Sequence, residues 1–428
     1  MKTTAAGLVK YIHASPSPYH CVATSAGLLR DAGFIELDER SEWGTLRPGD
    51  RRFVLRDGTL IGWVMGAKAP AQSGFRFIGA HTDSPNLRLK PKPEYKKEGY
   101  LMWGVEVYGG VLLHTWLDRD LGVSGRVAVR GTEGIELRLL RIDEPIARIP
   151  NLAIHLNREI RTDGLKLNKQ NHMPPMLGLF DEDDPRLLHR LVARHLAVEP
   201  QDVMGWDLML HDVQPPTLGG VDQQFVFAPR LDNQGSCYTA LEALLSLDEV
   251  PESTAGVALF DHEEVGSRSA HGADSVHLEY LLTRIERCAS EKAAGGIERA
   301  AANSFLVSAD MAHGVHPNYA DRHEGNHKPT LNGGPVVKIN TNQRYSTSGE
   351  TAAIFRRACQ DEGVAVQEFV NRTDLACGST IGPISAGRLA IRSVDVGCAM
   401  LSMHSVREQT GSDDVDRMAR VKARILRG

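Results

Sequence analysis

The chain has few cysteines and no excess of basic residues. The first argues against a disulfide-rich protein, and the second against a protein that binds nucleic acid or anionic membranes. Only six of its 428 residues are cysteine, and no two of them form a C-x-x-C pair. This scatter argues against a disulfide framework and predicts reduced thiols in a cytoplasmic protein. Lys and Arg total 49 against 54 Asp and Glu, which gives a net charge of −5. We therefore expect no binding to nucleic acid or to an anionic membrane surface.

Long apolar segments and repeats are also missing. No window approaches the roughly 18 to 20 uncharged apolar residues of a membrane span. Residues 1–19 lack the apolar region and cleavage site of a signal peptide. The remaining composition, 42% hydrophobic and 24% charged, is that of a globular protein. Because one hydrophobic core rarely serves so long a chain, we expect two domains.

Apolar runs alternate with amphipathic segments near both ends of the chain. The runs Phe75–Ala80 and Thr254–Phe260 predict buried strands. Residues 351–361 and 413–426 have the spacing of amphipathic helices. Residues 87–229, which lie between the two strand runs, contain glycine-punctuated, β-like runs with few helical periods.

These patterns predict an α/β fold with a mostly parallel sheet flanked by helices. We expect one catalytic domain in two parts, residues 1–86 and 230–428, and a β-rich domain inserted at 87–229. Two helices are expected over Thr4–Ala32, interrupted at Ser15–Pro18 because proline cannot continue a helix interior. Leu389–Val394 is expected to be a strand.

Several of these elements are followed by residues that commonly bind metals. They are His81 and Asp83 after 75–80, Asp232 at a helix start, Glu263 and Glu264 after 254–260, Asp310 after 303–308, and His404 after 389–394. A single His or Asp at such a place is usually a turn or cap residue. Since open α/β sheets bind ligands at the carboxyl ends of their strands, five such places in one sheet favour a shared site.

The pair Glu263–Glu264 is the most informative local feature. Neighbouring side chains of an extended segment point in opposite directions, so one carboxylate can bind a metal while the other acts as a general base. A solvated acidic turn is the alternative interpretation. Imidazole and carboxylate ligands without thiolate suit zinc, with manganese or cobalt as alternatives. Asp83 is close enough in sequence to orient the ring of His81.

Five segments together resemble the aspartyl aminopeptidase family, whose members are dinuclear zinc exopeptidases that remove N-terminal acidic residues. The segments are Gly79–Pro85, Arg230–Asn233, Asp261–Ser267, Ser308–His313 and Met403–Glu408. They occur in the order of the family and extend over nearly the whole chain, with no departure at a ligand position.

The resemblance implies two Zn²⁺ ions per subunit. Asp232 would bridge them, His81 and Asp310 would complete one site, and Glu264 and His404 the other. Glu263 would be the general base, and Asp83 would orient His81.

The resemblance also implies a dimerisation role for residues 87–229 and assembly of dimers into a dodecamer. His155 would stabilise the oxyanion in the active site of a neighbouring subunit, although its apolar neighbours alone predict a core or edge-strand histidine. Lys338, Tyr345 and His313 would line the pocket for the peptide substrate. By itself, Lys338 could equally be a solvated lysine at a strand end.

Three other functions are weighed against this one. A dinuclear aminopeptidase could prefer neutral N-terminal residues, and an inactive shell protein could bind cargo peptides without cleaving them. A structural zinc module is disfavoured because such sites are rich in cysteine. Five further histidines receive no role, namely His262, His271, His316, His323 and His327.

Overall fold

The computed structural model describes residues 2–179 and 186–428. It contains two compact units. Unit 1 consists of Met1–Asp83, Pro216–Met403 and Glu408–Gly428, and unit 2 of Ser84–Pro215 and His404–Arg407. Among the described residues, no helix has both the length and the hydrophobicity needed to cross a membrane. All six cysteines are free thiols.

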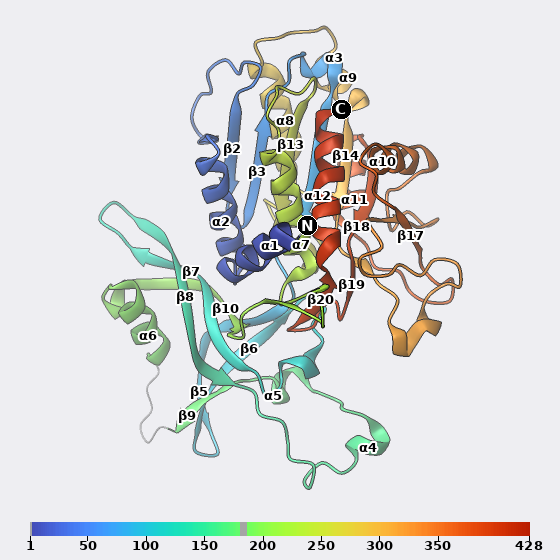
Figure 1. The fold of residues 1–428 in the computed structure, drawn as a ribbon. Helices are drawn as coiled ribbons and strands as arrows, with labels where there is room; N and C mark the ends of the chain where they lie inside the picture. Colours follow the sequence, from blue (N-terminus) through green and yellow to red (C-terminus); the bar gives the residue numbers. More distant parts are fainter. Residues whose placement is uncertain (1, 180–185) are drawn as a thin grey trace. The chain divides into compact units, whose positions relative to one another are not determined.

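Unit 1 is built on a nine-stranded sheet, visible in the upper part of Figure 1. In spatial order its strands are β1 (Ile35–Glu36), β2 (Arg51–Arg56), β3 (Thr59–Val64), β13 (Thr254–Phe260), β4 (Phe75–His81), β14 (Phe305–Ala309), β18 (Arg392–Gly397), β16 (Val336–Ile339) and β17 (Gln367–Val370). Five of the eight neighbouring pairs are parallel. The predicted α/β fold with a mostly parallel sheet is therefore confirmed.

Helices cover both faces of this sheet, because its central strands are apolar on both sides. On β4, for example, Ile78 and Ala80 belong to one core, whereas Phe75 and Phe77 belong to the other. The first face is covered by α1 (Lys2–Ala14), α2 (Pro18–Asp31), α7 (Leu231–Leu245), α10 (Gly349–Asp361) and α12 (Ser412–Arg427). The second is covered by α8 (His277–Cys288), α9 (Gly296–Asn303) and α11 (Ile381–Leu389).

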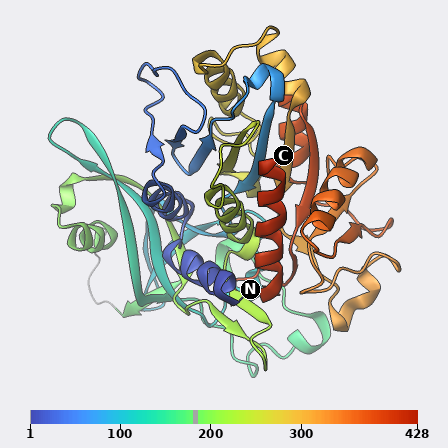
Figure 2. The same cartoon turned by 45° about the horizontal axis from the view of Figure 1, so that its top comes forward.

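The proline-rich break and the C-terminal helix were both predicted from the sequence. Helix α1 ends at Ala14, and α2 begins at Pro18, with the Ser17 hydroxyl accepting a hydrogen bond from the His20 backbone N–H. Helix α12 lies beside α7, as both views show (Figure 1, Figure 2), and its apolar side is buried. These two expectations are confirmed.

The expected strand at Leu389–Val394 is displaced in the structure. Helix α11 continues to Leu389, and β18 begins only at Arg392. A short apolar run suits a buried helix end as well as a strand, so periodicity could not locate this boundary.

A second, smaller sheet completes unit 1. Its strands are β11 (Thr217–Gly219), β12 (Phe225–Ala228), β20 (Glu408–Gly411), β19 (Ala399–Leu401) and β15 (Ala312–His313). The predicted boundary at residue 229 assigns β11 and β12 to the inserted domain. In the structure they belong to unit 1, because β12 pairs with β20 near the C-terminus.

Unit 2 is a closed antiparallel barrel with its own apolar core. Its strands are β5 (Asn86–Lys97), β6 (Tyr100–Tyr108), β7 (Asp120–Arg130), β8 (Ile135–Arg148), β9 (Met176–Leu179) and β10 (Val203–Asp212). Helix α6 (Leu187–Leu196) packs against the barrel, and α4 (Ile160–Asp163) and α5 (Lys169–His172) are short. The β-rich character predicted for the middle of the chain is thus observed.

Candidate metal centre

Three parallel strands of unit 1 end at one edge of the large sheet, and each leads into a predicted ligand. Phe260 of β13 lies opposite His81 of β4, and Ser308 of β14 lies opposite Gly79. Because the carboxyl ends of parallel strands open on the same side, His81, the segment after Phe260 and Asp310 come together there.

His81 lies at the centre of this cluster. Its Nε2 is 3.5 Å from Asp232 Oδ1, 3.6 Å from Asp310 Oδ1 and 3.9 Å from Glu263 Oε2. Ligand atoms of His81, Glu263 and Glu264 also lie within 4.8 Å of one another. These separations exceed the roughly 3.2 Å limit of a good hydrogen bond. They leave space for a cation among the side chains.

Asp83 connects the histidine to the two glutamates. The Nδ1 of His81 lies 3.0 Å from the Asp83 carbonyl oxygen, which can only accept, so Nδ1 donates and Nε2 would be left to bind a metal. The carboxylate of Asp83 accepts hydrogen bonds of 3.1 Å from the backbone N–H groups of Glu263 and Glu264. Asp83 therefore positions both the ring and the short 3₁₀ helix Glu263–Val265.

The cluster concentrates negative charge where little water reaches it. Burial, together with the charges of Asp310, Asp83 and Asp232, raises the pKa of Glu263 to about 8, against the opposing influence of His81. Burial and the Asp232 charge raise the pKa of Glu264 well above its usual value. Crowded carboxylates of this kind repel one another unless a cation lies between them.

The pKa of His81 is also perturbed. Burial lowers it, but the nearby carboxylates of Asp232, Asp310 and Asp83 outweigh burial and raise the pKa well above the usual value. The donors of the cluster are thus one imidazole and several carboxylates. This set fits zinc, and also manganese or cobalt. The nearby Cys237 is no competitor, because its thiol donates to the His81 carbonyl oxygen at 3.0 Å.

Two residues that the sequence analysis did not single out support Asp232. The carboxylate of Glu408 accepts a hydrogen bond of 3.0 Å from the Asp232 backbone N–H, and Asn233 donates to the carbonyl of Ala309 at 2.9 Å. Glu408 ends one of the five segments quoted above and lies opposite Ala228 in the small sheet. Its place at the end of that segment was the signal in the sequence that could have indicated its supporting role.

The three residues expected to contact substrate lie near one another: His313 and Tyr345 contact the Phe369 ring, and Lys338 lies beside Tyr345. Lys338 is buried, so the solvated interpretation is wrong; its Nζ lies 3.3 Å from Asp310 Oδ2 and donates to the Met311 carbonyl at 3.1 Å. The Lys338 ammonium also lies 5.1 Å from the centre of the Tyr345 ring. The rings of His313 and Tyr345 lie 5.6 and 6.5 Å from that of Phe369.

Two predicted site residues belong to unit 2. His404 lies in the segment His404–Arg407, and its Nδ1 is 3.0 Å from the Gly110 carbonyl oxygen. His155 lies in an exposed turn closed by a hydrogen bond from Leu156 N–H to the Ala153 carbonyl. The interpretation of His155 as a core or edge-strand residue is therefore wrong, because alternation with apolar residues does not require burial.

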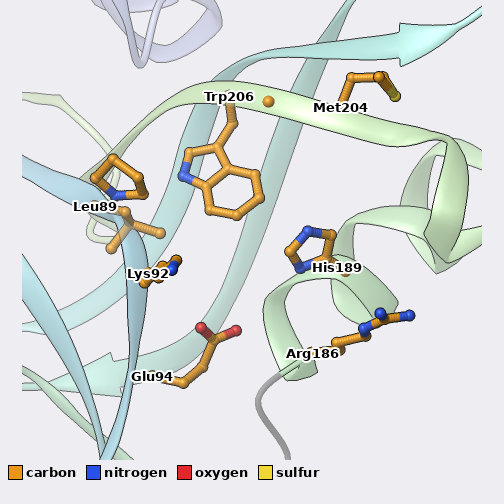
Figure 3. Close-up of a pocket in the computed structure, with 9 residues that line it drawn as sticks. Leu89, Lys92, Glu94, Arg186, His189, Met204 and Trp206 are labelled. Carbon is orange, nitrogen blue, oxygen red and sulfur yellow. The ribbon is translucent and has the colours of Figure 1, made fainter.

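Unit 2 also contains a pocket of about 810 Å³, shown in Figure 3. Trp206 and His189 form one part of its lining, with their rings 5.0 Å apart and nearly perpendicular. None of the predicted ligand, catalytic or substrate residues lines it. The predicted ligands His81, Asp232 and Asp310 instead lie together in unit 1.

A sheet edge that carries an imidazole among carboxylates is typical of a metallohydrolase. The sequence profile of the family described as aminopeptidase I zinc metalloprotease (M18) matches residues 11–422. The chain therefore belongs to the M18 family of zinc aminopeptidases, as its resemblance to aspartyl aminopeptidases predicted.

Individual relatives agree with this assignment. The probable M18 family aminopeptidase 2 of Ectopseudomonas mendocina (strain ymp) is 47% identical over 420 residues, which is 97% of this chain and 96% of the relative. The structure of Ape4 in complex with Nbr1 has a TM-score of 0.96 at 38% identity, covering 100% of this chain and 86% of that one. The S. cerevisiae mApe1 dodecamer has a TM-score of 0.86 at 30% identity, covering 99% and 96%.

Proposed function

We propose that this zinc aminopeptidase removes N-terminal Asp and Glu residues from peptides by means of a dinuclear metal centre. The observation that carries the proposal is the position of His81, whose Nε2 has three carboxylates within 4 Å. One imidazole can neutralise only one of these three carboxylates. The remaining negative charge suits more than one divalent cation.

Two Zn²⁺ ions per subunit would be held by five side chains, with Mn²⁺ or Co²⁺ as alternatives. In this proposal Asp232 bridges the ions, and the remaining ligands are His81, Asp310, Glu264 and His404. When bound, the ions supply a water of lowered pKa and polarise the scissile carbonyl.

The protein's own groups then move the protons. Glu263 accepts the proton of the attacking water and returns it to the leaving amine, acting first as base and then as acid. It is suited to this because its backbone N–H is held by Asp83 while its carboxylate faces His81. Asp83 acts by positioning Glu263 and the His81 ring.

An acidic side chain of the substrate needs a cation, and Lys338 provides one. Its ammonium is buried beside Asp310 and close to the Tyr345 ring, where water screens its charge poorly. We propose that Lys338, with Tyr345 and His313, selects acidic N-terminal residues.

We also propose that the protein forms dimers through unit 2 and assembles further into a dodecamer, the state named for the S. cerevisiae relative. Apolar side chains exposed on unit 2 support self-association, since large apolar groups on a surface favour contact with a partner. Leu152, Ile154 and Leu156, which flank His155, are 58%, 43% and 76% exposed. A surface of this kind could carry His155 to a neighbouring subunit, where the imidazole would stabilise the oxyanion.

A cytoplasmic location belongs to the same proposal. It is supported by six cysteines that remain free thiols, as expected in a reducing compartment.

The test of the proposed activity combines chelation with a substrate panel. The chelated protein should lose activity, and readdition of Zn²⁺, Mn²⁺ or Co²⁺ singly should restore it on chromogenic Asp, Glu, Leu and Gln substrates. We expect kcat/KM to be highest for Asp and Glu. Faster cleavage of Leu or Gln would favour the aminopeptidase of neutral preference, and no cleavage by the metal-loaded protein would favour an inactive shell protein.

The substitution Lys338→Met tests the origin of the preference. It removes the ammonium but keeps a side chain of similar length, so kcat/KM should fall by about 10- to 100-fold for an Asp substrate, the effect of one charge-assisted hydrogen bond. The Leu substrate should be affected far less. Because Lys338 also contacts Asp310, metal content is measured in parallel. An equal loss on both substrates would contradict the role in selection.

A further inference from the structure

A second group of metal-binding side chains lies in the segment that connects β13 to α8, apart from the residues around His81. It consists of Asp261, His262 and His271, whose ligand atoms all lie within 4.8 Å of one another. The two imidazoles face the same oxygen, since Asp261 Oδ2 is 3.8 Å from His262 Nε2 and 3.9 Å from His271 Nε2. The ring centres are 5.0 Å apart.

Each imidazole is also held at its other nitrogen. The Nδ1 of His271 lies 3.2 Å from Asp57 Oδ2, and the Nδ1 of His262 lies 2.9 Å from the Ser269 hydroxyl oxygen. At His271 the carboxylate accepts from Nδ1–H and leaves the lone pair on Nε2, which is the usual arrangement of a metal-binding histidine; at His262 the Ser269 hydroxyl can accept in the same way. These contacts hold both rings with Nε2 on the side of Asp261.

The backbone around Asp261 holds the group together. The Thr59 hydroxyl accepts a hydrogen bond of 2.9 Å from the Asp261 N–H and donates one of 2.8 Å to the His271 carbonyl. Asp261 Oδ1 accepts from the His262 N–H at 2.8 Å, which leaves Oδ2 facing the rings. Gly58 provides the space, because a Cβ at this position would lie 2.1 Å from Oδ2.

We propose that Asp261, His262 and His271 bind one divalent ion of the zinc type, in addition to the ions of the catalytic centre. Two imidazoles and one carboxylate are ligands that Zn²⁺ and Co²⁺ accept, with a fourth position left for water. Ligand atoms of a tetrahedral zinc site lie roughly 3.3 to 3.5 Å apart, so each imidazole nitrogen moves about half an ångström closer to the Asp261 oxygen when the ion binds. The two imidazoles are partly exposed, which gives the ion a route from solvent.

A bound ion would also restrain the backbone next to Glu263 and Glu264. It would join Asp261 and His262, which directly precede the two glutamates, to His271 on the other side of the loop. The loop is then stabilised by the free energy of ion binding, since the ion binds only where the three side chains are together.

The experiment compares metal content between the whole protein and the variant His271→Gln. Both are stripped with a chelator, dialysed against micromolar Zn²⁺ and analysed by mass spectrometry of the metal. We expect the variant to bind one equivalent less than the unsubstituted protein while retaining its peptidase activity. His13→Gln, which removes an exposed histidine of α1, should leave the count unchanged and serves as the matched control.

A second variant, Asp57→Asn, keeps all three ligands and changes only the partner of His271. It should lower the zinc affinity of this site by about 10- to 100-fold. If His271→Gln and the unsubstituted protein bind the same number of ions with the same affinities, the proposal is wrong. The comparison is repeated with Asp232→Asn as background, so that it remains valid even if the catalytic centre does not bind the ions assigned to it.

Discussion

The variant Glu263→Gln is expected to lose about 10²- to 10⁴-fold in kcat, the usual contribution of a general base, while keeping its metal ions. Glutamine has nearly the same shape as glutamate but cannot accept the proton of the attacking water. The backbone hydrogen bond from residue 263 to Asp83 does not depend on the side chain, so the local structure should persist. Single-turnover rates on an Asp substrate and metal analysis measure the two quantities.

The rate of Glu263→Gln identifies the general base only if the variant still carries its metal ions. Since Glu263 is not among the proposed ligands, the variant should carry as many ions as the unsubstituted protein. Near-normal turnover by a fully loaded variant would show that another group accepts the proton. A variant that is inactive because it has lost its ions would instead place Glu263 among the ligands.

The variant Asp232→Asn is expected to lose most of the metal and nearly all activity. Asp232 is buried, and its Oδ1 lies 3.5 Å from His81 Nε2. An amide removes the negative charge from the position proposed to bridge the ions, and a neutral oxygen is a much weaker ligand. Inductively coupled plasma mass spectrometry gives the metal content, and thermal unfolding with and without Zn²⁺ gives the stabilisation by metal.

The matched control is Asp321→Asn, which changes an exposed aspartate in unit 1. This control should keep its metal, its activity and the rise in Tm on addition of Zn²⁺. Circular dichroism establishes that the Asp232 variant is folded. Full metal content in a folded Asp232→Asn protein would contradict the bridging role.

Much of the fold could be predicted from local patterns. The strand Thr254–Phe260 was predicted with its observed bounds, because a strand buried on both faces appears in the sequence as a continuous, largely apolar run. Helix α12 was predicted from its spacing, because one side of it is apolar throughout. The strand predicted at 389–394 was misplaced. This run includes the end of a helix and the start of a strand, and its hydrophobic pattern does not show where one ends and the other begins.

The candidate site was predicted less completely. His81 ends a strand and Asp310 follows one, so their position at the sheet edge could be inferred from the parallel order. The roles of Asp83 and Lys338 within the cluster depend on contacts across long separations in sequence. Asp83 and Glu263, for example, are 180 residues apart. The local pattern around His155 predicted a core or edge-strand residue, but His155 is exposed, so local pattern alone did not determine its burial.

The sequence by itself determined which chemical groups this protein can use, because side-chain type and order along the chain are local properties. They were sufficient to indicate the α/β class, the family and the acidic and histidine residues available for metal binding. Only the tertiary structure decided that the carboxylate of Asp83 holds both glutamates, that Lys338 is buried against Asp310, and that His262 and His271 face one oxygen of Asp261. The reason is that side-chain packing and register bring distant segments together, and no local period records which residues then meet.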